Sequence, residues 1–341
     1  MSRRDLTIWL AGVLAVALLG LGALVRVPYV SLSPGPAIDT LGTADGTAHG
    51  APILGITGAK TYPTDGQLEL TTVSVRDQIR LWQALRGWLS SGEAVIPREF
   101  IYPEHQTDQQ NQAQNQQEMT ESQDNATDAA LSELGLATLS VDSVSKGGAA
   151  VGKLRPGDVL VSVDGTKATG PGSLRRLVRA HRVGDEVVVG IVRDGSPLSV
   201  TMTTGKAKDD PKQSALGIIT KISSRIKVDI KLKDIGGPSA GLMFTLGIID
   251  KLTPGSLTGG RNIAGTGTID VDGTVGQIGG IAEKLLGARR VGATVFLVPD
   301  ANCAEAAKNR PDGLTLIRVK DLDGALAGLS AVRAGRTAPS C

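Results

Sequence analysis

The chain has 341 residues, which is enough for two or three domains. Its 36 Lys and Arg residues nearly balance its 34 Asp and Glu residues, so the net charge of +2 gives no sign of a nucleic-acid partner. The sequence also lacks the phosphate-binding pattern G-x-x-x-x-G-K-S/T, so we expect no ATP use by this polypeptide. No metal site and no cofactor is predicted.

Residues 8–25 contain no charged side chain and are long enough to nearly span a bilayer as a helix. Arg3 and Arg4 precede this segment, which favours a cytoplasmic location for residues 1–7. Arg26 follows it and weakens that preference. A cleaved signal peptide is the alternative, but its apolar region is usually shorter and no small-x-small cleavage site precedes Arg26. We therefore predict an uncleaved single-pass anchor in the cell membrane, with the bulk of the chain extracytoplasmic.

Two segments follow that carry no recognisable chemistry. Residues 27–100 form an N-terminal extracytoplasmic region of mixed character, with a strand expected over 67–75 and a helix over 77–89. Residues 101–128 are dominated by Gln, Asn, Glu and Asp, a composition that suits a polar linker or a solvated helix rather than a packed core. The cysteines, Cys303 and Cys341, could pair in an oxidising compartment, but two cysteines do not define a disulfide framework.

Residues 129–204 alternate strand-like runs with a helical segment over 172–180 and a hairpin turn at Arg193-Asp194-Gly195. Together with the run Leu154-Arg-Pro-Gly-Asp-Val-Leu160, this segment resembles a PDZ domain of the bacterial protease-associated type. The resemblance implies that a peptide is added to the sheet as an extra strand and that backbone amides hold its C-terminal carboxylate. Leu134-Gly135-Leu136 is the candidate for that loop; the alternative is that both leucines belong to the core.

Residues 212–335 form the last unit. Residues 226–232 alternate apolar and charged side chains, which predicts a half-exposed strand that leads into the turn Gly236-Gly237-Pro238-Ser239-Ala240-Gly241. The following residues, 240–249, are apolar nearly all round and predict a buried helix. Ser239 fits the G-x-S-x-G pattern of a nucleophile, but it would also serve as an ordinary helix N-cap.

A serine nucleophile needs a base, and the histidines of this chain are badly placed to supply one. His49, His105 and His181 all precede Ser239, so the Ser, Asp, His order of α/β-hydrolases is unavailable. Lysine is a known alternative base. On a helical wheel Lys284 lies in the middle of an apolar face, which consists of Ile281, Lys284, Leu285, Ala288 and Val291. Burial there would lower the pKa of this lysine and make it a candidate general base, although most lysines extend to water.

These motifs resemble the proteolytic domain of Lon-type peptidases over about residues 216–299. The nucleophile turn of that family, Pro-Ser-Ala-Gly, is matched by residues 238–241, and its lysine by Lys284 after Ile278-Gly279-Gly280. The family's Thr-Gly segment is matched by Thr266-Gly267, which implies a supporting role for Thr266. The resemblance also implies an oxyanion hole built from the backbone amides of Ser239 and Ala240. Lon proteases usually have Asp three residues before the serine, where this chain has Gly236.

The fold class expected is therefore mixed α+β: an N-terminal transmembrane helix, a PDZ domain and a Lon-type α/β proteolytic domain. This order is similar to that of a bacterial membrane-anchored PDZ–Lon (YlbL-like) group. It implies an ATP-independent serine endopeptidase that cleaves extracytoplasmic proteins or peptides, with a homo-oligomer left open. The alternative is a non-catalytic membrane scaffold that binds peptides through its PDZ domain. The intact Ser, Lys and Thr argue against that alternative, and Gly236 argues mildly for it.

Overall fold

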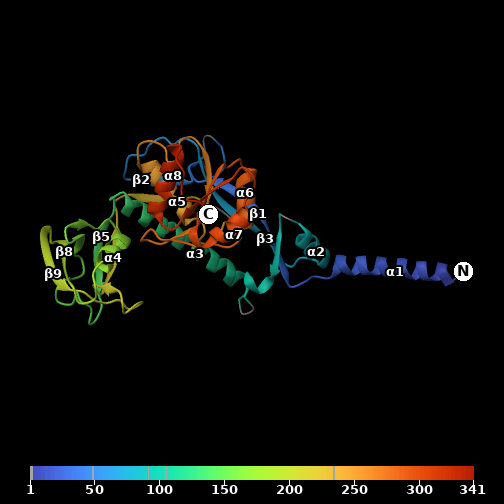
Figure 1. Cartoon of the computed structure of the whole chain (residues 1–341), viewed down its shortest axis with the longest axis horizontal. Coiled ribbons are helices and arrows are strands. Elements are labelled where there is room, and N and C mark those ends of the chain that lie inside the picture. The colour runs from blue at the N-terminus through green and yellow to red at the C-terminus, as the bar shows by residue number, and fades with distance from the viewer. Residues whose placement is uncertain (1–2, 48–49, 91, 104–105, 233–234) are drawn as a thin grey trace.

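The computed structural model describes residues 3–47, 50–90, 92–103, 106–232 and 235–341. Helix α1, Arg3–Leu24, projects from the body of the molecule at one end, and a smaller unit of strands with one helix, α4, lies at the other end (Figure 1). Within the described ranges, no helix has the length and apolar character needed to traverse a membrane. The membrane anchor expected over residues 8–25, which lies almost wholly within α1, therefore stays a prediction.

The central element is a six-stranded sheet with the order β18-β17-β14-β3-β1-β4. Four neighbouring strands, β3, β14, β17 and β18, run parallel, whereas β1 runs antiparallel to both β3 and β4. The strands are β1 Tyr29–Asp39, β3 Gln67–Arg76, β4 Ala94–Pro97, β14 Asn262–Gly265, β17 Val295–Pro299 and β18 Thr315–Val319. Residues 27–100 thus share one sheet with the C-terminal domain instead of forming a separate region.

Helices cover both faces of this sheet, because its inner strands bury side chains on both sides. One face packs against α5, with α3 and α8 around it, and the other packs against α6 and α7. Successive residues of β14 illustrate the alternation, since Ile263 belongs to the first layer and Ala264 to the second. The helices are α3 Asp108–Glu133, α5 Gly241–Leu252, α6 Ile281–Arg290, α7 Cys303–Lys308 and α8 Leu322–Arg333.

Helix α3 corrects the prediction that residues 101–128 form a linker or a solvated helix. Thr107 and Gln110 form a capping box at its start, and the helix packs along α5. Its buried apolar residues recur with helical spacing and join the main core: Met119, Ala126, Ala129, Ala130 and Leu131. These residues are few and mostly alanines. The many Gln, Asn and Glu residues around them dominate the composition of the segment, so the apolar face was not recognised from the sequence.

The second unit contains a sheet of the order β12-β5-β6-β8-β9, with the short strand β7 paired to β6. Helix α4, Pro171–Arg179, packs over it and closes a separate core. The strands are β5 Thr138–Val144, β6 Val159–Val163, β7 Thr166–Lys167, β8 Glu186–Arg193, β9 Ser196–Thr203 and β12 Ile218–Ser223. Strand β12 lies at the edge of the sheet and beyond residue 204, where this unit was expected to end.

Short elements connect the two units and complete the proteolytic domain. The half-exposed strand expected over 226–232 is β13, which pairs with β2 and alternates exposed with half-buried residues. The helix expected over 77–89 begins later, at Leu81. The remaining elements are α2 Leu81–Leu89, β2 Leu54–Thr57, β10 Gly205–Lys206, β11 Ser214–Ala215, β13 Lys227–Ile230, β15 Thr268–Ile269, β16 Val275–Gly276, η1 Arg98–Phe100 and η2 Asp300–Asn302.

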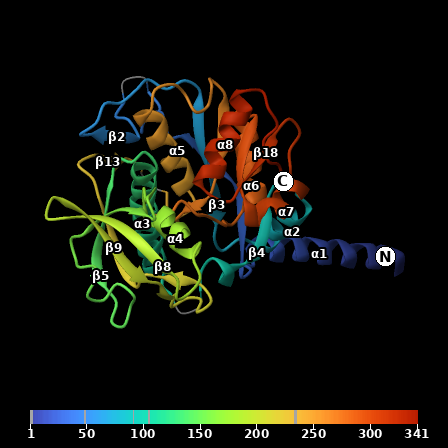
Figure 2. The same ribbon diagram turned by 60° about the vertical axis from the view of Figure 1, so that its left-hand side comes forward.

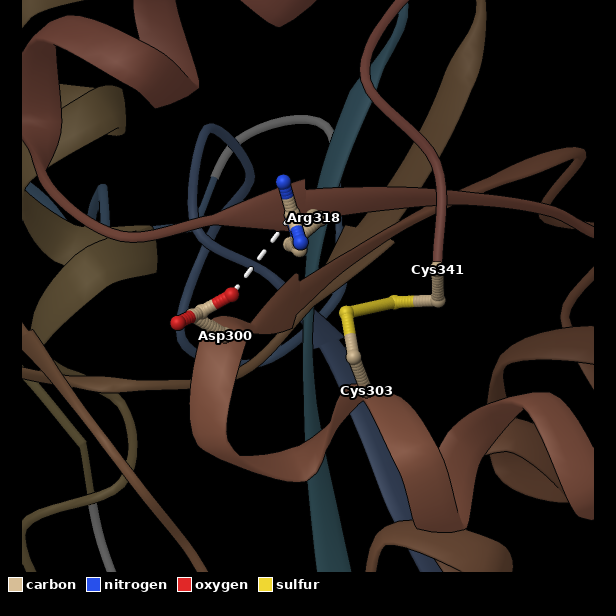
Figure 3. The surroundings of a disulfide bond; sticks show 4 residues. All are labelled: Asp300, Cys303, Arg318 and Cys341. Carbon is tan, nitrogen blue, oxygen red and sulfur yellow. Dashed lines mark ion pairs between the residues drawn. A yellow bond between two sulfur atoms is a disulfide. The ribbon is translucent and has the colours of Figure 1, made fainter.

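A disulfide joins Cys303, at the start of α7, to Cys341 at the end of the chain (Figure 3). The tail that carries Cys341 lies along β18, where the amide of Arg318 donates to the carbonyl of Pro339. Arg318 also forms an ion pair with Asp300 in the 3-10 turn before Cys303 (Figure 3). The disulfide therefore holds the last residues of the chain against the edge of the main sheet.

We expect Cys341→Ser to lower the free energy of unfolding by about 2–4 kcal/mol, because the disulfide closes a loop between residues 38 positions apart and so restricts the unfolded chain. Denaturant unfolding of the oxidised wild type and the variant measures this difference. The reduced wild type serves as the matched control and should resemble the variant. Equal stability of all three proteins would contradict the prediction.

Candidate active site

Ser239 lies in a tight turn between β13 and the buried helix α5. Gly237 adopts a left-handed conformation with φ of +84°, which glycine tolerates better than other residues. The N-cap of α5 is Ala240, and no side chain caps this helix. The side chain of Ser239 therefore does not serve as an N-cap and is free to take part in a different contact.

That contact is with Lys284, which α6 positions from the opposite layer. The Lys284 Nζ lies 2.9 Å from the Ser239 Oγ and 3.0 Å from the Thr266 Oγ1. Only 3% of the lysine is exposed, and burial lowers its pKa to about 8. A lysine with such a pKa is neutral in an appreciable fraction of molecules near neutral pH and can accept a proton.

Thr266 follows β14 and completes the group that surrounds the lysine. Its side chain is buried, and its hydroxyl donates to the Ser239 carbonyl oxygen at 3.0 Å. The amide of Gly267 donates to the same carbonyl at 2.9 Å. Because the single hydroxyl proton of Thr266 is used on Ser239, its oxygen accepts an N–H from Lys284. This arrangement directs the lone pair of a neutral Lys284 toward the Ser239 hydroxyl.

The amides expected to form the oxyanion hole lie at the same turn. Across the described ranges, the backbone N–H groups of Ser239 and Ala240 donate no hydrogen bond to a backbone or side-chain acceptor. They also precede the N-terminus of α5, where the helix dipole is positive. Both N–H groups are therefore available to a negatively charged oxygen.

Sequence reasoning missed the contribution of α3 to this turn. The amide of Gly237 donates to the Asn115 carbonyl at 3.0 Å, and the Ser122 hydroxyl donates to the Pro238 carbonyl at 2.9 Å. A Cβ added at Gly236 would lie 3.0 Å from the Cβ of Asn115. A side chain at position 236 would therefore press closely against α3. Ser122 and Asn115 carried no signal in the sequence, because they belong to a uniformly polar segment.

We expect Ser122→Ala to reduce kcat by about fivefold to tenfold, since one hydrogen bond of roughly 1 kcal/mol that holds the nucleophile turn is lost. Thr120→Ala is the matched control, because Thr120 lies on the exposed side of the same helix and should leave kcat unchanged. Steady-state kinetics on a peptide substrate measures both variants. Equal kcat values for wild type and Ser122→Ala would show that α3 does not position the turn.

The candidate carboxylate loop Leu134-Gly135-Leu136 is wrong in its location. These residues end α3: Gly135 is left-handed with φ of +64°, and the amide of Leu136 donates back to the Leu131 carbonyl. Leu134 packs against the proteolytic core, which was the alternative weighed from the sequence. None of the three residues lines the groove that lies between α4 and β12.

The structure instead contains a groove of about 400 Å³ between α4 and the edge strand β12. Leu174 and Val178 of the helix line one side, and Ile218 and Thr220 of the strand line the other. The loop that enters β12 has an apolar-Gly-apolar sequence, Leu216-Gly217-Ile218, of the same type as the rejected one. Sequence alone could not choose between the two loops, because only the tertiary fold shows which one borders a groove.

The groove and the nucleophile turn are formed in part by consecutive segments of the chain. Strand β12 is followed along the chain by β13, which lies beside β2 (Figure 2), and β13 is followed by the turn of Ser239. Arg175 lines the groove and also pairs with Asp272 of the proteolytic domain at 2.7 Å, and Arg176 pairs with Asp323 at 3.5 Å. None of the three histidines is seen at the serine. His181 contacts Asp164 within the smaller unit, and His49 and His105 lie outside the described residues.

Comparison with known families supports two domains. Residues 115–204 match the family model of the PDZ domain. Residues 199–329 match the model of the Lon protease (S16) C-terminal proteolytic domain. The two matches overlap at residues 199–204, and β12, the strand that borders the groove, lies beyond the PDZ match.

Two relatives agree with the second of these matches. The chain is 30% identical over 158 residues to a Lon protease of Clostridioides difficile, covering 41% of this chain and 20% of the relative. It is 34% identical over 146 residues to a Lon protease of Buchnera aphidicola subsp. Schizaphis graminum, covering 38% and 18%. The PDZ domain of an SdrC-like protein from Listeria monocytogenes is 19% identical over 24% of this chain and 85% of that chain, with a TM-score of 0.22.

The chain spans about a fifth of the length of these Lon proteases. The residues that match the model of the Lon proteolytic domain, 199–329, include the serine, lysine and threonine described above. The chain thus carries a segment that matches the PDZ domain and a segment that matches the Lon-type serine peptidase domain.

Proposed function

We propose that this protein is a membrane-anchored, ATP-independent serine endopeptidase in which Ser239 and Lys284 form a catalytic dyad. The observation that carries this proposal is the 2.9 Å separation between the Lys284 Nζ and the Ser239 Oγ in a buried setting. The test is incubation of the full chain with an unstructured protein, with Ser239→Ala beside it. Cleavage by the wild type alone supports an enzyme, whereas no difference between the two supports a peptide-binding scaffold.

The reaction would proceed through an acyl-enzyme. Neutral Lys284 accepts the hydroxyl proton of Ser239 as Oγ forms a bond to the scissile carbonyl carbon. The carbonyl oxygen becomes negative and accepts hydrogen bonds from the amides of Ser239 and Ala240. Lys284 then donates its proton to the leaving amine as the C–N bond breaks. Water releases the acyl group by the same sequence of steps, with Lys284 again accepting and returning a proton.

Independence from ATP is proposed on the motif content of the chain, which contains no G-x-x-x-x-G-K-S/T loop. Substrates would then have to reach the site already extended or unfolded. The expectation that they are extracytoplasmic is supported by the Cys303–Cys341 disulfide, because such bonds persist in oxidising compartments. The expectation of an anchor rests on the uncharged residues 8–25 and is tested by alkaline extraction of membranes, which should leave the protein in the pellet.

The groove between α4 and β12 is proposed as the peptide site of the PDZ domain. Strand β12 has β5 on one side only, so its other edge can pair with an added peptide strand. The Leu216-Gly217-Ile218 loop lies where the C-terminal carboxylate of such a peptide would end. Because β12 is followed by β13 and then by Ser239, the strand that pairs with a bound peptide would lie shortly before the nucleophile turn in the chain.

We expect peptides with a free C-terminal carboxylate to bind the full-length Ser239→Ala variant about tenfold to hundredfold more tightly than their amidated forms, because charge-assisted hydrogen bonds are lost on amidation. Fluorescence anisotropy with matched peptide pairs measures the difference, and the Ser239→Ala change prevents cleavage during the titration. Equal binding of both forms would rule out carboxylate capture at this loop.

A further inference from the structure

Helix α2 packs on the body of the protein in an unusual orientation, with its smallest residues inside. Ala84 and Gly87 are buried against the edge of the main sheet, and a Cβ added at Gly87 would lie 2.4 Å from Cγ2 of Val95. The large apolar residues point outward: 43% of Trp82, 50% of Leu85 and 90% of Leu89 is exposed. The helix therefore presents its apolar side to its surroundings.

These residues form one continuous stripe, because positions 82, 85 and 89 have the i, i+3, i+7 spacing of a single helix face. Trp88 lies beside the stripe and is 54% exposed, with its indole N–H 3.4 Å from the Val95 carbonyl and its ring packed edge-on against Tyr29. We call Trp82, Leu85, Trp88 and Leu89 the α2 patch. Contiguous apolar residues of this size on a surface usually mark an interaction site.

The position of the α2 patch indicates what covers it. The amide of Leu81 donates to the Val25 carbonyl at 3.0 Å, and Arg26 and Arg80 form a β-bridge. Helix α2 therefore begins close to the end of α1, whose residues 8–24 carry no charge, as Figure 1 also shows. Any lipid layer that surrounds α1 would have its boundary at the level of α2.

The chemistry of the surrounding residues fits that boundary. Arg76, Arg80 and Arg86 are exposed on and before α2 and can bind anionic headgroups. Tryptophan is enriched at membrane–water interfaces, where its ring lies in apolar surroundings and its N–H can reach water. A short helix with an apolar stripe and flanking arginines has the composition of a segment that lies in the plane of an interface.

We propose that the α2 patch is a docking surface for the headgroup region of an anionic lipid bilayer, and that it holds the peptidase domain against the membrane. The proposal rests on the membrane anchoring proposed above and adds a second, independent contact. A docked α2 restricts rotation of the domain about α1. It would thereby fix the distance of Ser239 from the membrane surface.

Tryptophan fluorescence of the full chain in vesicles tests this docking. The chain has three tryptophans, so Trp9→Phe with Trp88→Phe leaves Trp82 as the reporter. The vesicles contain phosphatidylcholine and phosphatidylglycerol with acyl chains brominated either near the headgroup or near the bilayer centre. We expect bromines near the headgroup to quench Trp82 by roughly twofold or more, and bromines at the centre to quench it little.

The matched control uses a residue of the same exposure at the other end of the molecule. Leu198 on β9 is also 43% exposed, and Leu198→Trp in a chain with all three tryptophans changed to Phe should not be quenched. Leu89→Glu adds a charge to the most exposed position of the stripe and should abolish quenching of Trp82. Both variants should still hydrolyse a soluble peptide at the wild-type rate, which shows that they are folded.

The outcomes separate the docking from the anchor. If the protein floats with the vesicles but Trp82 is quenched by neither bromine position, the docking is overturned and the anchor is supported. If the protein does not float with the vesicles, both are overturned. If Trp82 emission shifts to the blue with protein concentration and without quenching, the patch binds a second copy of the chain instead of lipid.

Discussion

Ser239→Ala and Lys284→Ala are each expected to reduce peptide hydrolysis by about three orders of magnitude or more, and the double variant should be little worse than either. The reason is that the two side chains act as one unit across a 2.9 Å contact, so loss of either removes the same proton transfer. Steady-state hydrolysis of a peptide substrate, with circular dichroism to show folding, measures these effects. Lys284→Arg should not restore activity, because a guanidinium does not lose its proton in proteins.

Lys251 provides the matched control for the lysine. It lies on α5, and burial lowers its pKa as well, but its Nζ donates to the Leu41 carbonyl and not to a serine. Lys251→Met should therefore keep nearly full activity. Thr266→Ser keeps the hydroxyl that orients Lys284 and should be far more active than Thr266→Ala. Full activity in Lys284→Ala, combined with an inactive Ser239→Ala, would show that another base serves the serine.

Activity is expected to rise about 50-fold between pH 6 and pH 8 and then to level off, because the base must be neutral and burial sets the pKa of Lys284 to about 8. Activity rises rather than falls with pH because a protonated lysine cannot accept the serine proton. Acid therefore inactivates the enzyme. The neutral fraction of Lys284 falls about fivefold from pH 8 to pH 7 and about ninefold from pH 7 to pH 6. The pH dependence of kcat/KM measures the pKa in the free enzyme.

A second buried group must be separated from Lys284 in this experiment. Burial and, to a smaller extent, the nearby Asp39 raise the pKa of Glu69 on β3 to about 7. Glu69→Gln removes this titration and should leave the midpoint of the activity profile unchanged. A midpoint that moves with Glu69→Gln, or a rate that is flat from pH 6 to pH 8, would contradict the role of Lys284.

Much of the site was evident from local sequence, because the chemistry depends on short segments. A glycine-rich turn before an apolar helix located Ser239, and the apolar face of a second helix located Lys284. The structure brings both to one point together with Thr266. The strictly alternating residues of β13 and the uniformly apolar α5 were also evident, since their periodicity reflects exposure directly.

Tertiary structure alone decided which segments of the chain share a core. Strand β3 pairs with β14 although about 200 residues separate the two strands, and backbone pairing of this kind leaves no mark on composition. Helix α3 has too few apolar side chains to be recognised as buried. Its role depends on carbonyl and hydroxyl groups of Asn115 and Ser122, which any polar segment could offer.

The peptide groove shows the same division. The sequence by itself determined that a PDZ domain is present, because its turns and strands are local. It offered two equivalent apolar-Gly-apolar loops, and only the packing of α4 beside β12 distinguishes them. The physical reason is that a groove is a property of two elements that meet in space, whereas the sequence specifies each element on its own.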